Sequence, residues 1–388
     1  MIHNPLYLVL ILIAVESGIL FLAGNTRTKH FFSFLPSMFW IYFLPMVLST
    51  CGFIDAKSPL YQGITRCLLP PALFMLLLNV DFKAISRLGP AALVMFFAGS
   101  FGIMLGMVIS FVVFKPWVGA QFWGGFGALS ASWTGGSANM IAVKEALNTP
   151  DNVFLPMVIM DTIVPYTWMG ILVALAVHQK GFDRWNGSDR RILDDLAKRT
   201  EHFSHQKKQK VELSKAVAVI ALALLIGSAA QAASVYLPTG KNVLSPYAWT
   251  IILVSSTAII LSMTPLSRIP DTGANKFGKW TLYFVLTSIG ARASLHNASQ
   301  VGILILAGVV VIIIHVLILL VTARLIRAPL FLVATASLSN IAGLVSAPVV
   351  AEVYQPGFAS VGLLLAILGH CLGAYNGILT GQICRLFN

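Results

Sequence analysis

Two stretches of this chain decide the fold, and their similarity to each other indicates an internal repeat. The first reads Ser130-Ala-Ser-Trp-Thr-Gly-Gly-Ser-Ala-Asn-Met-Ile-Ala-Val-Lys-Glu145. The second reads Ser337-Leu-Ser-Asn-Ile-Ala-Gly-Leu-Val-Ser-Ala-Pro-Val-Val-Ala-Glu352. At one constant offset Ser130 matches Ser337, Ser132 matches Ser339, Gly136 matches Gly343 and Glu145 matches Glu352. Paired polar, Gly-rich interruptions in the two halves of a hydrophobic chain point to the binding site of a transporter.

The composition excludes a water-soluble protein. Of the 388 residues, 57% are hydrophobic and only 10% are charged, whereas soluble domains carry about 25% charged residues. A membrane-spanning helix needs about 20 apolar residues. We therefore expect an all-α polytopic membrane protein whose first partner is the lipid bilayer. The net charge of +12 is interpreted as topogenic charge in short loops, so no nucleic-acid partner is expected.

The apolar segments fall into two sets of six. They lie at 5–24, 32–52, 67–80, 88–114, 122–143 and 152–178, and then at 214–236, 247–265, 279–291, 300–323, 330–350 and 358–384. The stretch 179–212 between the sets carries nine Lys or Arg and six Asp or Glu. The predicted organisation is a first repeat at 1–178, a charged cytoplasmic linker at 179–212 and a second repeat at 213–388.

The distribution of basic residues predicts the topology. If 122–147 and 330–352 dip into the membrane and return, most basic loops share the cytoplasmic side. These residues are Arg27, Lys29, Lys83, Arg87, Arg268, Lys276, Arg324 and Arg327, together with the linker. About ten transmembrane helices and two re-entrant segments then form two inverted repeats with both termini periplasmic. The competing arrangement has two broken helices that cross the membrane fully.

The two interruptions carry the chemistry that a small charged solute needs. Backbone that is unwound within a membrane must be buried in protein or line water. A broken helix offers free N–H groups at one stub, which attract anions, and free carbonyls at the other, which attract cations. The predicted substrate-binding residues are Ser130, Ser132, Thr134, Gly135, Gly136 and Asn139 in the first interruption and Ser337, Ser339, Asn340 and Gly343 in the second. The alternative is that these small residues serve helix packing only.

Ionisable residues within apolar segments are further candidates. Asp161 follows the first interruption and is the strongest candidate for the coupling cation, with Na⁺ expected at Asp161 and at the hairpin carbonyls. Ser346, His370 and Asn376 are candidates for the same role, although His370 could equally be a core histidine. Arg292 can hold a substrate carboxylate bidentately or extend to lipid headgroups.

Other ionisable groups receive weaker interpretations. Glu145 and Glu352 lie at hairpin ends and are expected at the membrane interface, and His315 is expected to be a packed residue. The sequence contains no P-loop, HExxH or GxSxG motif. We therefore expect neither an enzyme nor a protein with an organic cofactor.

Three motifs carry a resemblance to a known family. They are Ala-Leu-Ser-Ala-Ser-Trp-Thr-Gly-Gly-Ser-Ala-Asn, Thr-Ser-Ile-Gly-Ala-Arg-Ala-Ser and Ser-Asn-Ile-Ala-Gly-Leu-Val-Ser-Ala-Pro-Val-Val-Ala. They resemble the YjcL-like (DUF819) bacterial membrane proteins, which are distantly similar to the glutamate and citrate sodium symporters and to the bile-acid symporters. The resemblance implies inverted repeats, a mobile core, a scaffold that often dimerises and elevator-like alternating access. The second hairpin departs from the pattern, because Ala342-Gly343 replaces the glycine pair.

The expected function is secondary active transport in the bacterial inner membrane. Na⁺ or H⁺ would be coupled to movement of a small organic anion such as a carboxylate, an amino acid or a short peptide. A channel or a non-transporting membrane subunit is the alternative. A channel conducts without saturation, and a structural subunit tolerates Asn139→Ala and Asp161→Asn.

Overall fold

The computed structural model is all-helical in the part of the chain that it describes, apart from one isolated bridge between Ile2 and Ile54. The described residues are 1–28, 31–32, 37–78, 80–189, 191–200, 213–239, 244–264, 274–293 and 300–388. Of the basic loop residues discussed above, Lys29 and Arg268 lie outside these ranges, as does the linker segment 201–212. Seven of the described helices are long and apolar enough to cross a membrane, which defines a multi-pass membrane protein.

Each half of the chain contributes a similar series of helices. The first half contains α1 (Pro5–Gly24), α3 (Ser37–Thr50), α4 (Pro59–Leu77), α5 (Phe82–Ser86), α6 (Gly89–Val118), η1 (Ala120–Phe122), α7 (Trp123–Gly135), α8 (Ser137–Ala146) and α9 (Asp151–Leu175). The second contains α12 (Leu213–Ser234), α13 (Pro246–Ser262), α14 (Ala274–Arg292), α15 (Val301–Ile326), α16 (Leu330–Ile341), α17 (Gly343–Tyr354) and α18 (Ala359–Leu386). Between them lie η2 (Ala176–His178), α10 (Gln179–Asn186) and α11 (Arg191–Thr200).

Local sequence signals start several of these helices. Asn4 accepts a hydrogen bond from the Leu6 N–H and is followed by Pro5 at the first position of α1. Ser245 accepts a bond from the Ala248 N–H in the same way before α13. Proline at the first helical position has no N–H to satisfy, and the preceding polar side chain binds an orphan donor. Hydropathy also placed the starts of α1 and α13 within one residue, whereas α4 and α14 begin at Pro59 and Ala274, before the apolar segments predicted from 67 and 279.

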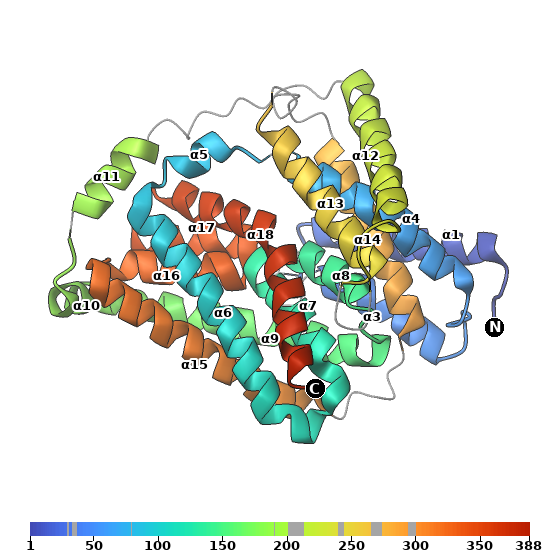
Figure 1. The fold of residues 1–388 in the computed structure, drawn as a ribbon, viewed down its shortest axis with the longest axis horizontal. Helices are drawn as coiled ribbons and strands as arrows, with labels where there is room; N and C mark the ends of the chain where they lie inside the picture. The colour runs from blue at the N-terminus through green and yellow to red at the C-terminus, as the bar shows by residue number, and fades with distance from the viewer. Residues whose placement is uncertain are drawn as a thin grey trace.

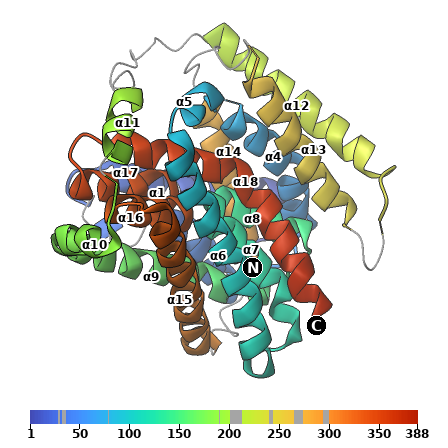
Figure 2. The ribbon, with the colours of Figure 1, turned by 60° about the vertical axis from the view of Figure 1, so that its left-hand side comes forward.

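The helices form two groups that pack mainly within themselves (Figure 1). The frame group consists of α1, α3, α4, α12, α13 and α14, and the hairpin group of α6, α7, α8, α9, α15, α16, α17 and α18. In both views α12 and α13 lie on the opposite side of the molecule from α15 and α16 (Figures 1 and 2). The groups meet where α8 and α18 contact α13 and where α9 contacts α3.

Both interrupted segments return to the face from which they start. A Cβ placed on Gly124, near the start of α7, would lie 2.6 Å from the Thr149 hydroxyl, just after α8. The rings of Phe331 and Phe358, at the two ends of the second segment, are 5.3 Å apart between centroids. We call α7–α8 the first hairpin and α16–α17 the second hairpin.

The two hairpins open near different parts of the chain. Arg385, close to the C-terminus, lies over the ring of Trp123 at the start of α7. The start of α16 lies beside α10, because the Asp183 carboxylate accepts a hydrogen bond of 2.8 Å from the Leu330 N–H. We call the side that holds the C-terminus the terminal face and the side that holds α10 the linker face.

The beginning of the charged linker is structured. The linker predicted from 179 begins with the short helix α10, which follows α9 and packs on α16. The Asn186 amide is buried and donates to the carbonyls of Ala323 and Ala328 at 3.2 and 2.8 Å. Polar side chains thus satisfy backbone groups at this helix junction.

Glycines set the close packing of the hairpin group. Gly369, Gly373, Gly377 and Gly381 recur every fourth residue on α18 and face α7. A Cβ on Gly373 would lie 2.6 Å from the Gly135 Cα, so the two backbones touch. Small residues at this spacing allow membrane helices to approach closely.

Candidate functional site

Each hairpin breaks at a glycine with a left-handed backbone. Gly136 has φ +85° and Gly343 has φ +67°, and both have open space where a Cβ would be. These two glycines are the pair that matched between the two halves of the sequence. A positive φ costs a non-glycine residue free energy, so glycine is required here by backbone geometry. Gly135, in contrast, has φ in the ordinary range and is required by its contact with α18.

The break in the first hairpin is held by two side chains. The Gly135 carbonyl accepts hydrogen bonds of 2.8 Å from the Asn139 amide and 2.8 Å from His370 Nδ1. The same Asn139 amide donates to the His370 carbonyl at 3.0 Å. A carbonyl only accepts, so Nδ1 of His370 carries the proton and Nε2 of a neutral ring is an acceptor. Asn139 and His370 therefore lie together at this break.

The remaining polar residues of α7 are buried. The Ser130 hydroxyl lies 3.0 Å from the Thr380 hydroxyl of α18, and Thr134 donates to the Ser130 carbonyl at 2.9 Å. Asp161 of α9 is partly buried, and its carboxylate lies against the side chain of Ser132. The structure thus joins Asp161 to the first hairpin and places a carboxylate next to a hydroxyl in the interior, two oxygen ligands of the kind that a hard cation prefers.

The polar residues of the second hairpin hold it to its neighbours. The Asn340 amide donates to the Phe96 and Ala336 carbonyls at 3.2 and 2.9 Å, and its oxygen accepts a 2.6 Å bond from Ser100. The Ser339 hydroxyl donates to the Thr335 carbonyl at 2.7 Å. These groups are fully buried, so they anchor α16 within the hairpin group.

Ser337 joins three helices through an extended network. Its hydroxyl accepts a 2.9 Å hydrogen bond from the Trp168 indole and lies 2.9 Å from His315 Nε2. His315 Nδ1 lies 2.9 Å from the Gly99 carbonyl, so this nitrogen donates and Nε2 of the neutral ring accepts from Ser337. His315 is completely buried, which fits the expected packed residue. Of the other candidates, Ser346 is buried and Asn376 is partly buried, and its carbonyl accepts from Thr380.

A buried cluster of charges joins the two helix groups. Arg292, at the end of α14 in the frame group, donates to Glu145 at 2.8 Å and lies 3.4 Å from Asp151. Lys144 of α8 lies 2.7 Å from each of the same two carboxylates and is only 3% exposed. The guanidinium that we offered as a substrate ligand is therefore occupied by protein carboxylates in this conformation. Sequence reasoning missed Lys144 and Asp151, although charged residues this close to a membrane hairpin were a signal.

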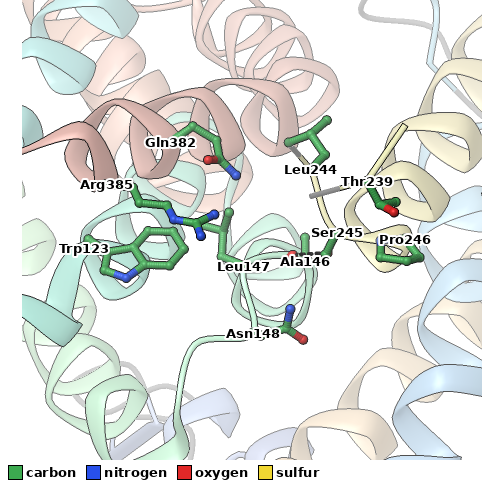
Figure 3. Close-up of a pocket in the computed structure, with 10 residues that line it drawn as sticks. All are labelled: Trp123, Ala146, Leu147, Asn148, Thr239, Leu244, Ser245, Pro246, Gln382 and Arg385. Atoms are coloured by element: carbon green, nitrogen blue, oxygen red, sulfur yellow. Dashed lines mark hydrogen bonds between the residues drawn. The ribbon is translucent and has the colours of Figure 1, made fainter. Parts of the chain in front are cut away.

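A cavity of about 400 Å³ lies between the groups on the terminal face (Figure 3). Trp123, Leu147, Gln382 and Arg385 line it from the hairpin group, and Leu244, Ser245 and Pro246 from the frame group. Asn148 lies at its edge in a left-handed conformation, with φ 50°. A second cavity of about 290 Å³ shares Asn148, Ser245 and Pro246 with the first and adds Arg66 of α4. The two adjoining cavities were not foreseen, because their walls come from segments far apart in the sequence.

In the described part of the chain, no three His, Cys, Asp or Glu side chains gather into a group of the kind that holds a transition metal. The geometry thus defines a multi-pass helical membrane protein with two returning hairpins and a cavity between two helix groups. Residues 11–387 match the family described as "Protein of unknown function (DUF819)". The chain belongs to this family, as its motifs predicted.

A curated relative supports the membrane location. It is described as "Uncharacterized membrane protein YjcL" of Bacillus subtilis (strain 168). It is 23% identical to this chain over 349 residues, and the alignment covers 87% of each protein.

Proposed function

We propose that this protein is a secondary active transporter of the bacterial inner membrane. It couples Na⁺ or H⁺ to the movement of a small organic anion. The hairpin group moves against the frame group, so that a site between them faces one side of the membrane and then the other. The two halves are inverted repeats with ten crossings and two re-entrant hairpins, and the termini are periplasmic.

The observation that carries the proposal is the pair of returning hairpins in one helix group. Their breaks fall on glycines at equivalent positions of the two halves, and one hairpin opens beside Arg385 and the other beside α10. Discontinuous helices that meet near the membrane midplane form the substrate and ion sites of many transporters.

The interface between the groups supports relative movement. It contains the charge cluster around Arg292, a 2.8 Å hydrogen bond between Ser256 of α13 and Tyr375 of α18, and the two cavities. Interfaces that are small and polar allow domains to move relative to one another. The Asp161 carboxylate, next to Ser132, supplies the site for the coupling cation.

Two other functions make different predictions. A channel needs no movement of one helix group against the other, and a structural subunit needs neither movement nor a coupling ion. The proposed homodimer, formed through the frame group, rests on the family resemblance and is checked by the mass of the purified protein in detergent.

Access to the tip of the first hairpin tests the proposal without knowledge of the substrate. The four native cysteines, all unpaired, are replaced by alanine, and Ser137, which is partly exposed at the tip, is replaced by cysteine. Membrane vesicles of both orientations are treated with a membrane-impermeant maleimide. We expect Ser137→Cys to react from both faces, because the site alternates between them.

Cross-links then show which movement is responsible. Ser245 of the frame group bonds to the Ala146 carbonyl of the hairpin group, so the double variant Ala146→Cys/Ser245→Cys locks the groups together when oxidised. The matched control is Ser110→Cys/Ala307→Cys, because Ser110 donates to the Ala307 carbonyl at 2.8 Å within the hairpin group. We expect the first cross-link to confine labelling to one face and the control to change nothing. Labelling from both faces in the locked protein would contradict the proposal.

A further inference from the structure

We propose that the two adjoining cavities on the terminal face bind a small organic dianion, with Arg385 and Arg66 each holding one of its negative groups. This inference rests on the proposed function and names the class of its substrate. It goes beyond the hairpin residues, because neither arginine belongs to a hairpin.

The charges that line the cavities carry the inference. Arg385 lines the larger cavity and Arg66 the smaller one, and among the described residues no Asp or Glu lines either cavity. Arg385 lies over the Trp123 ring, with its guanidinium carbon 5.3 Å from the ring centroid. This cation–π contact restrains the guanidinium, and its N–H groups can bind a carboxylate. Within the described residues, neither arginine forms an ion pair with a carboxylate.

The nearest acidic groups are already neutralised. Glu145 precedes and Asp151 follows the cavity segment 146–148 in the sequence. Both carboxylates are paired with Lys144 and Arg292. This cluster contains two positive and two negative side chains, so it adds no net charge. Arg385, which is partly exposed, and Arg66, which is exposed, therefore keep their positive charge available to an anion at the cavities.

Uncharged donors complete the site. The Gln382 and Asn148 side chains lie at the larger cavity from two different segments, and Figure 3 shows Gln382 beside Arg385. Asn148 lines both cavities, so a single ligand that spans them would pass its amide. Ligand sites commonly combine a few polar groups with an apolar wall, and Trp123, Leu147 and Leu244 supply that wall here.

The size and division of the cavities determine the ligand class. Volumes of about 400 and 290 Å³ can hold a small organic molecule. One arginine in each cavity favours a molecule with two negative groups over one with a single group. Because walls come from both helix groups, such a ligand contacts the two parts that the proposed function requires to move.

The experiment is thermal unfolding of the purified full-length protein in detergent at constant ionic strength. The probes are malonate, succinate and glutarate, with butyrate as the monocarboxylate of the same chain length as succinate. A ligand that binds only the folded protein raises the melting temperature with its concentration. We expect at least one dicarboxylate to do so, and butyrate to need a concentration at least about tenfold higher.

Variants assign the effect to the two cavities. Arg385→Gln and Arg66→Gln should each weaken dicarboxylate binding about ten- to hundredfold, since each removes a charge-assisted hydrogen bond. Arg385→Lys keeps the charge and should show an intermediate loss. The matched control is Arg324→Gln, because Arg324 is stacked over Trp185 at 5.4 Å but lies at the linker face. The melting temperature of each variant without ligand reports its folding.

Three outcomes would overturn the inference. They are no stabilisation by any dicarboxylate, equal affinity for succinate and butyrate, or binding that Arg385→Gln and Arg66→Gln leave unchanged. The labelling experiment on Ser137→Cys contains no ligand, so it decides the proposed function separately. Labelling from both faces without dicarboxylate binding would reject the ligand class and keep the transporter. Dicarboxylate binding without two-sided labelling would keep the ligand class and reject the transporter.

Discussion

The two hairpins share a break but differ in what surrounds them. In the first, the return helix α8 packs against α13 and α18, and its end carries Lys144 and Glu145 of the buried charge cluster. In the second, the return helix α17 leaves Val345 80% exposed and Val349 and Val353 about half exposed. Among the described helices, the main contact of the frame group with a hairpin is that of α13 with α8.

Equivalent sequence positions in the two halves do not have equivalent roles. Glu145 and Glu352 match in the alignment of the halves, yet Glu145 binds Arg292 and Glu352 is exposed and accepts one bond from the Gly357 N–H. Under the proposed movement, we expect the exposed face of α17 to meet the frame group in the opposite conformation. Substitutions in the two hairpins and at Asp161 test this difference between the hairpins.

The largest difference is expected between Glu145→Gln and Glu352→Gln. Removing the buried carboxylate leaves Arg292 and Lys144 with Asp151 alone, and breaking a buried pair costs about 3 kcal/mol or more. Removing the exposed Glu352 should change the free energy of unfolding by less than about 0.5 kcal/mol. Denaturant or thermal unfolding of both variants in detergent measures the difference. Equal costs would mean that the charge cluster does not stabilise the structure.

A smaller difference is expected between Asn340→Ala and Asn139→Ala. Asn340 is completely buried and bonds to Ser100, Phe96 and Ala336, so its loss should cost about 2 kcal/mol. Asn139→Ala should cost about 1 kcal/mol, because His370 still donates to the Gly135 carbonyl. The same unfolding measurement applies. If Asn139→Ala proves the more harmful, the first break depends on its amide more than on His370.

The breaks themselves should respond alike. Gly136→Ala and Gly343→Ala should each cost about 1 kcal/mol, since both glycines have a positive φ and open space for a methyl group. A useful contrast is Gly373→Ala, whose Cβ would press on the α7 backbone. Melting temperatures of the three variants make the test. A neutral effect at only one of the two breaks would show that the hairpins differ in backbone as well as in surroundings.

The smallest effect on stability is expected for Asp161→Asn, which keeps the size of the side chain beside Ser132. Its effect should appear in the response to the coupling cation. Exchange of Na⁺ for K⁺ should lower the melting temperature of the wild-type protein and leave Asp161→Asn unchanged if Na⁺ binds there. A response to pH with no response to Na⁺ would assign the role to a proton. An undiminished Na⁺ response in the variant would remove Asp161 from the site.

Much of the architecture could be predicted from local sequence features. The composition indicates a membrane protein, and the glycine-rich stretches around Gly136 and Gly343 mark both breaks. The recurrence of glycine at every fourth residue from Gly369 to Gly381 on α18 also indicates close helix packing. The packing interpretation of the small residues proved right for Gly135, which touches α18, while Gly136 forms the break itself. Adjacent identical residues cannot be told apart without knowing which one meets a neighbour.

The sequence by itself determined the class of protein and the positions of the two breaks. These properties follow from hydropathy and from backbone geometry, which act over a few residues. Only the tertiary structure decided that Arg292 meets Glu145, that Asn340 anchors α16 and that Arg385 and Arg66 face adjoining cavities. The contacts of Arg292 and Asn340 join residues more than 100 positions apart, and the cavity walls come from both halves of the chain. Pairing over such distances depends on how whole helices pack, and the order of residues along the chain does not specify it locally.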